Sequence, residues 1–352
     1  MKSYFENRFC EYLDSSWTVS IAGNEYQSSE VFKICDPTSY DASFTEWIED
    51  QKDSARQRVK EFLSERGCLQ RFNRLAEQVI NNQVLPFVGA GMSKPSGFVL
   101  WRTFLKELAK EDSGVESKIE ELILKGHFED AAQCIVDHFN ENILAEQVEN
   151  YFYRQLFEVK GPVLLLPSLF NQGCMTTNFD IVLEKTYREH GSEFDNILVG
   201  DELKKICNNA EIDGHMLFKI HGSANNATGR ILTTREYEEV YERDKSLPDL
   251  FAKLVVNRSL LFLGCSLSMD RTFQALRQIK ININSKKSNK RLNIRHYALL
   301  ADPGFEEIPC RRSDLEKAEI HPIWYPLKEG IMDHDSCIED ILVALSVGPI
   351  NE

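Results

Sequence analysis

From residue 84 onward the chain alternates short apolar runs with longer helical patterns, and this alternation constrains the fold more than any other feature. Each run is only a few residues long, which suits a strand and is too short for a helix. The runs cover residues 84–88, 174–177, 216–220, 259–264, 296–300 and 320–325. Because apolar strands joined through helices are typical of parallel sheets covered on both faces, we predict an α/β fold with a parallel sheet.

Apolar residues at helical spacing fill the intervals between these runs. Residues 101–160 hold several such patterns in succession and predict a helical block inserted after the first strand. Shorter helices are expected over residues 181–190, 269–280 and 336–345.

The beginning of the chain has a different character. It starts with a strand-like run, continues with helical patterns and contains no residue that suggests catalysis. We therefore predict an N-terminal extension over residues 1–80, used for packing or assembly, and a sheet domain over residues 81–352. Phe44 and Trp47 are candidates for a subunit contact, because aromatic side chains are enriched at interfaces.

The charge balance bears on possible partners. Lys and Arg total 41 against 55 Asp and Glu, so the formal net charge is −14, whereas proteins that grip nucleic acid carry a basic excess. We expect no direct nucleic-acid binding. Residues 280–295 hold six basic residues and no acid, which is typical of a solvated loop, with contact to a nucleic-acid-bearing partner as the alternative.

No apolar run is long enough to cross a bilayer, and the first residues lack the apolar segment of a signal peptide. We therefore expect a cytoplasmic protein without membrane contact. The nine cysteines are widely spaced, and the closest two, Cys10 and Cys35, lie 25 positions apart. This spacing argues against a zinc ribbon or other metal site and predicts free thiols, mostly buried.

Glycine-rich and polar residues follow the apolar runs, at the positions where open α/β sheets bind ligands. The first run leads into Gly89, Ala90, Gly91 and Ser93. Glycines there let the backbone approach a pyrophosphate, and N–H groups at a helix start face the anion. A tight turn without a ligand is the plain alternative.

The later runs end in groups suited to acid–base chemistry. Asn178 can bind a ribose hydroxyl or a water, and Asp180 can hold a ribose, although both residues could instead cap a helix. His221 is placed for general-base work, with a structural role as the alternative. Gly264 permits close backbone approach, and Ser266 can bond a phosphate or ribose.

The order of these clusters resembles the sirtuin family. The sirtuin pattern G-A-G-x-S … G-I-P-D-F-R is similar to residues 89–93 and 97–102, T-Q-N-x-D to 176–180, H-G to 221–222, and G-T-S-L to 264–267. The resemblance covers roughly residues 80–300. It implies a sirtuin-like, Rossmann-type parallel sheet, carrying here the inserted helical block and the N-terminal extension.

Three departures refine the resemblance. The four-cysteine zinc module of the deacylases is absent from the sequence, Leu100 replaces an Asp, and Thr177 replaces a Gln. With these departures the chain resembles the bacterial sirtuin-like proteins of antiphage defence, whose known activity is NAD⁺ cleavage rather than protein deacylation.

The resemblance implies a set of roles. NAD⁺ is the substrate and no metal is needed. Asn178 orients the attacking water or a ribose hydroxyl, and His221 is the general base. NAD⁺ is held by Gly89, Ala90, Gly91, Ser93, Arg102, Thr177, Asp180, Gly264 and Ser266. The products are nicotinamide and ADP-ribose or its cyclic form.

The resemblance also implies how the activity is used. NAD⁺ depletion would serve abortive infection, and activation would come from assembly of a homo-oligomer or from a partner. A hexameric DNA translocase ATPase of the HerA type and a phage protein are the candidate partners. The alternatives are an NAD-dependent protein deacylase or ADP-ribosyltransferase, and a non-catalytic nucleotide-sensing scaffold.

Overall fold

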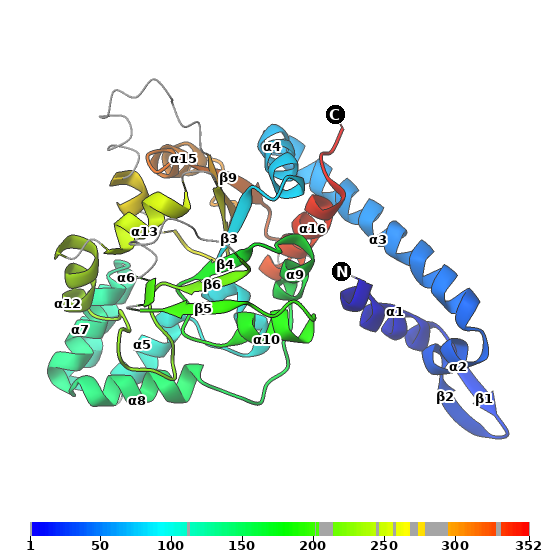
Figure 1. The fold of residues 1–352 in the computed structure, drawn as a ribbon, viewed down its shortest axis with the longest axis horizontal. Helices are drawn as coiled ribbons and strands as arrows, with labels where there is room; N and C mark the ends of the chain where they lie inside the picture. The colour runs from blue at the N-terminus through cyan, green and yellow to red at the C-terminus, as the bar shows by residue number, and fades with distance from the viewer. Residues whose placement is uncertain are drawn as a thin grey trace.

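The computed structural model describes residues 2–110, 113–200, 202–203, 214–243, 246–255, 258–267, 274–278, 295–328 and 332–351. Within this part of the chain, seven parallel strands form one sheet in the order β5-β6-β4-β3-β7-β8-β9 (Figure 1). The strands are β3 Val84–Val88, β4 Gly173–Thr176, β5 Asn196–Val199, β6 Met216–Lys219, β7 Ser259–Leu263, β8 His296–Ala301 and β9 Ile320–Tyr325. The predicted α/β fold with a parallel sheet is confirmed.

The strand order places a topological switch point at the centre of the sheet. From β3 the chain first builds β4 on one side and later returns to build β7 on the other. Ligands of open α/β sheets bind beyond the carboxyl ends of the strands at such a switch point. The residues after β3, β4 and β7 are therefore the ones that the topology brings together.

Four helices between β3 and β4 form the predicted insertion: α5 Trp101–Ala109, α6 Ser113–Leu124, α7 Phe128–His138 and α8 Glu141–Phe152. They are followed by η3 Pro162–Leu165 and α9 Leu166–Leu169. The later helices are α10 Val182–Glu189, α12 Thr234–Tyr237, the π-helical turn Glu238–Arg243, α13 Ser246–Leu254, α15 Ile308–Glu316 and α16 His334–Val347. Figure 1 shows the insertion and α12 together at one end of the molecule, away from α4 and α16.

The N-terminal extension has a far end and a near end. It consists of α1 Lys2–Ser16, the hairpin β1 Thr18–Ile21 and β2 Asn24–Gln27, α2 Ser28–Cys35, α3 Pro37–Glu65 and α4 Leu69–Ile80. Helix α3 runs outward from the sheet domain, with α2 and the hairpin at its tip, and α1 runs from there back toward α16, where Tyr4 bonds Glu339 (Figure 1). At this far end Phe44 and Trp47 pack against Phe9. Phe44 is fully buried and is therefore not available for the subunit contact that the sequence suggested, whereas Trp47 is half-buried and its role in such a contact stays a prediction.

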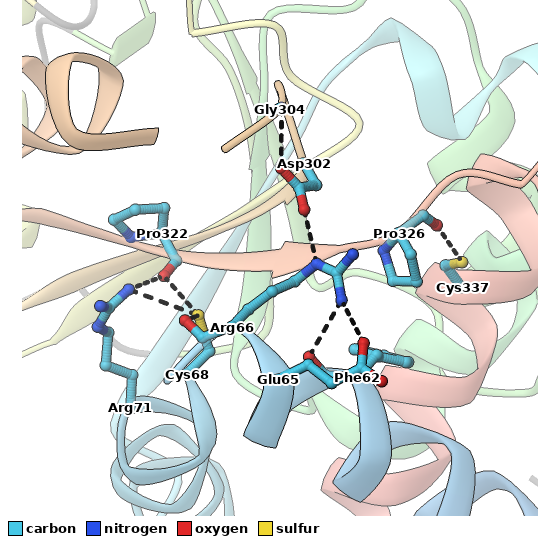
Figure 2. Close-up of polar contacts among 10 residues, drawn as sticks. All are labelled: Phe62, Glu65, Arg66, Cys68, Arg71, Asp302, Gly304, Pro322, Pro326 and Cys337. Atoms are coloured by element: carbon cyan, nitrogen blue, oxygen red, sulfur yellow. Dashed lines mark hydrogen bonds and ion pairs between the residues drawn. The ribbon is translucent and has the colours of Figure 1, made fainter. Parts of the chain in front are cut away.

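The near end is joined to the sheet domain by polar contacts (Figure 2). Arg66 contacts the Asp302 carboxylate at 2.7 Å, and Arg71 donates to the Pro322 carbonyl at 2.6 Å. Arg58 forms a two-pronged ion pair with Asp340, at 2.7 and 2.6 Å. The helices before the predicted boundary at residue 80 thus pack on the sheet domain. The division into two units stays a prediction.

Several expectations concern the chain as a whole. In the part that the structure describes, no helix combines the length and apolar character that a bilayer crossing needs. The cysteines of the described residues are free, with Cys68, Cys174 and Cys337 buried and Cys35 and Cys310 exposed. Most of the basic segment at 280–295 lies outside the described residues.

Candidate active site

The glycine loops after β3 and β7 lie against each other. The Gly89 amide donates to the Leu263 carbonyl at 2.8 Å, and the Gly91 amide donates to the Gly264 carbonyl at 3.0 Å. A Cβ on Gly91 would lie 2.8 Å from the Gly264 oxygen, and one on Gly264 would lie 2.6 Å from the Met92 nitrogen. Gly264 also has a φ of +65°, which side chains rarely adopt. These glycines let two backbone turns touch at the switch point.

The loop after β4 is hydrogen-bonded to the loop after β3. The Asn178 side-chain amide donates to the Ser93 hydroxyl at 3.1 Å. The Thr176 hydroxyl fixes this loop, because it donates to the Val88 carbonyl at 2.7 Å and accepts from the Asn178 backbone N–H at 2.9 Å. Ser93 and Asn178 are 3% and 8% exposed. Two of the predicted clusters therefore meet.

Asp180 is buried in the same loop. Its carboxylate accepts from the Val182 amide at 3.0 Å, which starts α10, and it also bonds Ser93. Burial raises the pKa of Asp180, and the nearby Lys219 ammonium opposes that rise. The sequence left two alternative roles for Asp180, a helix cap and a ligand-binding group. One side chain can fill both roles in this position.

Lys219, the last residue of β6, holds the loop that contains Asp180. The sequence did not predict this role. The Lys219 side chain is 1% exposed, and its ammonium donates to the Asp180 carbonyl at 2.5 Å and to the Glu184 carboxylate at 2.7 Å. Charged side chains are rarely buried unless they are paired. A lysine inside the apolar run at 216–220 was the signal that could have revealed it.

His221 follows β6 and is enclosed by two tyrosines. Its Nε2 lies 2.8 Å from the Tyr241 hydroxyl, and its Nδ1 lies 3.2 Å from the Tyr237 hydroxyl. Burial lowers the pKa of His221 to about 3, so the imidazole is neutral at physiological pH. The sequence analysis did not predict these tyrosines. Their only signal in the sequence is a spacing of four residues, which places both on one face of a helix.

The tyrosine segment is held by the helical insertion. The Thr234 hydroxyl donates to the Asp130 carboxylate of α7 at 2.6 Å. The buried Arg230 donates to the Ala145 carbonyl of α8 at 3.1 Å. Thr233, and not Thr234, caps α12 and forms a capping box with Glu236, so the Thr234 hydroxyl can bond α7.

The remaining predicted residues vary in exposure. Ala90, Thr177 and Gly264 are half-buried, whereas Ser266 and Arg102 are exposed. Arg102 lies on α5, one residue after Trp101, whose ring packs at 5.6 Å from that of Phe179. The cluster that contains Gly264 and Ser266 is contacted by a guanidinium that the sequence did not predict. Arg311 of α15 donates to the carbonyls of Ser266 and Leu267, both at 2.7 Å.

The low pKa of His221 predicts an unusual pH dependence. If His221 acts as the base, it must be neutral, and burial keeps it neutral well below its ordinary pKa of about 6.5. Because kcat/KM reports the free enzyme, in which the tyrosines cover His221, we expect its acidic limb for NAD⁺ cleavage to lie below about pH 5, far from that ordinary value. The measurement is a pH–rate profile of the wild type.

Two variants at Tyr241 serve as a matched pair for this profile. Tyr241→Ala admits water to the imidazole and should move the acidic limb upward, because burial is what lowers the pKa of His221. Tyr241→Phe keeps the ring covered and should leave the limb low. A wild-type limb near pH 6.5 would contradict the prediction.

The sequence predicts no bound metal, and this prediction has its own test. Among the described residues, no group of three or more His, Cys, Asp or Glu side chains is placed to hold a metal ion. We expect elemental analysis of protein purified without chelators to find well under one zinc per chain. Stoichiometric zinc that survives dialysis would reopen the deacylase alternative.

Comparison with known proteins identifies the class of fold. Residues 172–323 match the model of the SIR2-like domain, a range that includes the loops after β4, β6 and β7. This part of the chain is therefore similar to the SIR2-like domain, in agreement with the predicted resemblance to sirtuins.

Similar proteins from bacteria give the nearer relationship. The chain is 24% identical over 269 residues to NAD(+) hydrolase ThsA of Cytobacillus dafuensis, covering 70% of this chain and 51% of that protein. It is 26% identical over 201 residues to the protein of that name from Enterococcus faecium, covering 55% and 39%. The predicted resemblance to bacterial sirtuin-like NAD⁺ hydrolases is confirmed, and the chain spans about half the length of these relatives or less.

Proposed function

We propose that this chain cleaves the N-glycosidic bond of NAD⁺ and releases nicotinamide and ADP-ribose. The observation that carries the proposal is the placement of Asn178 and His221 on adjacent strands. Thr176 of β4 pairs with Lys219 of β6, so each of the two side chains lies two residues beyond a paired position. The Asn178 amide, which can orient a hydroxyl, and the neutral His221 imidazole thus follow neighbouring strands at the same distance from the strand ends. Both lie beside the switch point.

The reaction balances with these groups. The bond between the ribose C1′ and the nicotinamide nitrogen breaks, and its electron pair neutralises the cationic ring, so the leaving group departs uncharged. The oxocarbenium-like ribosyl cation is attacked by water, as in glycoside hydrolysis. His221 accepts the proton that the water loses, and Asn178 orients the water or the ribose hydroxyl. Ser93 and Asp180 position Asn178 and the substrate.

The site is closed in this structure, which supports a restrained resting state. Asp180 and His221 are 5% and 7% exposed, so a nicotinamide ring cannot reach them without movement. The insertion holds the tyrosine segment over His221 through Arg230 and Thr234. An unrestrained hydrolase would drain the NAD⁺ of its own cell, and we infer that displacement of this segment opens the site.

The proposed role is cytoplasmic NAD⁺ depletion in abortive infection, with activation by assembly or by a partner. A HerA-type translocase ATPase and a phage protein are the candidate partners, as the family resemblance implies. The product, ADP-ribose or its cyclic form, follows from whether water or the adenine ring attacks C1′.

The central experiment measures nicotinamide release by the full chain, alone and with the ATPase, with and without an acetylated peptide. We expect nicotinamide and an ADP-ribose product in equal amounts without peptide. The Arg230→Ala variant loosens the contact with α8 and should raise the rate of the isolated chain. Release only with peptide would favour the deacylase. NAD⁺ binding without release under all these conditions would favour the scaffold.

Assembly through the far end of the extension is a further prediction. The exposed large apolar residues gathered there are Tyr12, Trp17, Ile21, Tyr26 and Ile34, which are 43–78% exposed. We expect the full chain to form oligomers and a chain lacking residues 1–50 to be monomeric in light scattering, with a changed rate of nicotinamide release. Because the deletion also removes Phe5, Phe9 and Phe44, which are buried, circular dichroism must verify that the truncated chain folds. A monomeric, fully active full chain would contradict activation by assembly.

A further inference from the structure

A cavity lies at the end of the sheet opposite to the candidate active site. It has a volume of about 500 Å³ and is lined by polar side chains of α4, by Gln83 just before β3, and by Arg295 and Tyr297 at the start of β8. All of these strand residues precede or begin a strand, whereas the catalytic clusters follow strand ends. Cavities that hold small ligands span this range of volumes.

Two buried polar atoms on the wall of the cavity have no partner. The Tyr297 side chain is 1% exposed, and its hydroxyl makes no hydrogen bond with any described residue. The side-chain carbonyl oxygen of Gln78 is buried in the same way. Buried polar groups are nearly always hydrogen-bonded, because an unpaired one lowers the stability of the fold. A phenylalanine at position 297 would avoid that cost. Both atoms belong to side chains that line the cavity, so a ligand bound there could supply the missing hydrogen-bonding partners.

Two guanidinium groups on the cavity wall carry the electrostatic argument. Burial raises the pKa of Tyr297, while Arg295 and Arg74 oppose that rise and Glu77 adds to it, so all three charges lie within reach of the hydroxyl. Neither arginine forms an ion pair with a residue that the structure describes. The cavity thus has a positive excess inside a chain whose net charge is −14.

We propose that this cavity binds a small phosphate ester of mononucleotide size. Arginine forks match phosphate oxygens, and the Tyr297 hydroxyl can donate to the same anion. The Gln78 oxygen requires a donor, which a ribose hydroxyl or a base amine provides and bare phosphate at neutral pH provides poorly. The ligand would bridge α4 of the N-terminal extension and β8 of the sheet. This proposal stands apart from NAD⁺ cleavage at the other end of the sheet.

The test is calorimetric titration of the full chain with AMP, adenosine and inorganic phosphate. We expect AMP to bind, phosphate alone to bind more weakly and adenosine not to bind measurably. Arg74→Gln and Arg295→Gln should each weaken AMP binding by about tenfold or more, because each removes a charge-assisted contact. Arg188→Gln, an exposed arginine of α10, is the matched control and should change nothing.

The Tyr297→Phe variant separates ligand binding from a structural role. It removes an unpartnered buried hydroxyl, so the free protein should melt at the same temperature as the wild type or higher, while AMP should raise that temperature less. Phosphate binding as tight as AMP binding, lost in the arginine variants, would assign the site to free phosphate. Absence of AMP and phosphate binding, or binding that survives both arginine changes, would overturn the proposal. Unchanged nicotinamide release by the variants keeps this outcome separate from the active site.

Discussion

Replacing His221 by alanine is expected to lower the rate of nicotinamide release by roughly 10²-fold or more, the usual scale for a lost acid–base group. The imidazole is neutral and held at both nitrogens, and an alanine side chain has no atom that can accept the proton from the attacking water. The measurement is single-turnover NAD⁺ cleavage under the conditions that activate the wild type, with circular dichroism to verify folding.

Asn178→Ala should produce a loss of similar size for a different reason. The variant removes the amide that bonds Ser93 and orients the attacking group, but it leaves the base in place. His190→Ala is the matched control, because this exposed histidine bonds only the Ser168 hydroxyl among the contacts that the structure gives it. Full activity in either the His221 or the Asn178 variant would remove that residue from the mechanism.

The sheet could be predicted because its strands are buried on both faces. The run at 84–88 is entirely buried, and such a run is apolar throughout. Strand β5 was missed for the converse reason. Its residues are exposed or half-buried at the edge of the sheet, and its apolar run is only three residues long, from Ile197 to Val199.

The site could be predicted only where it follows a strand directly. Gly89, Asn178 and His221 occupy strand ends, and the topology of a parallel sheet gathers strand ends at one edge. Tyr241 and Arg311 come from helices, and their approach depends on how those helices pack. No local sequence pattern encodes that packing.

The N-terminal extension shows the same limit at a larger scale. The sequence predicts helical patterns in this extension, but the two ends of the long helix α3 have different surroundings. Its start packs on α1 through Phe44, and its end carries Arg58 onto Asp340 of α16. The partner in the second contact lies 282 positions away, so only the folded chain reveals it.

Lys219→Met is expected to cause the largest loss of stability of any single change considered for this site. Removal of one partner from a buried ion pair typically lowers the free energy of unfolding by about 3–5 kcal/mol, because the other charge stays buried and unpaired. Here Glu184 would lose its ammonium partner at 2.7 Å, and the carbonyl of Asp180 would lose its donor. Urea unfolding of wild type and variant, followed by circular dichroism, measures the difference.

A second substitution tests the cause of that loss. Lys219→Met combined with Glu184→Leu removes both charges and should recover much of the stability, since replacement of a whole buried pair by apolar residues is often neutral. Lys125→Met breaks an exposed pair with Glu121 on α6 and should change the free energy of unfolding by less than about 0.5 kcal/mol. Lys219 also opposes the rise in the pKa of Asp180 that burial causes, so the double variant should regain stability without regaining full NAD⁺ cleavage. A Lys219→Met protein as stable as the wild type would show that this pair does not hold the Asp180 loop in place.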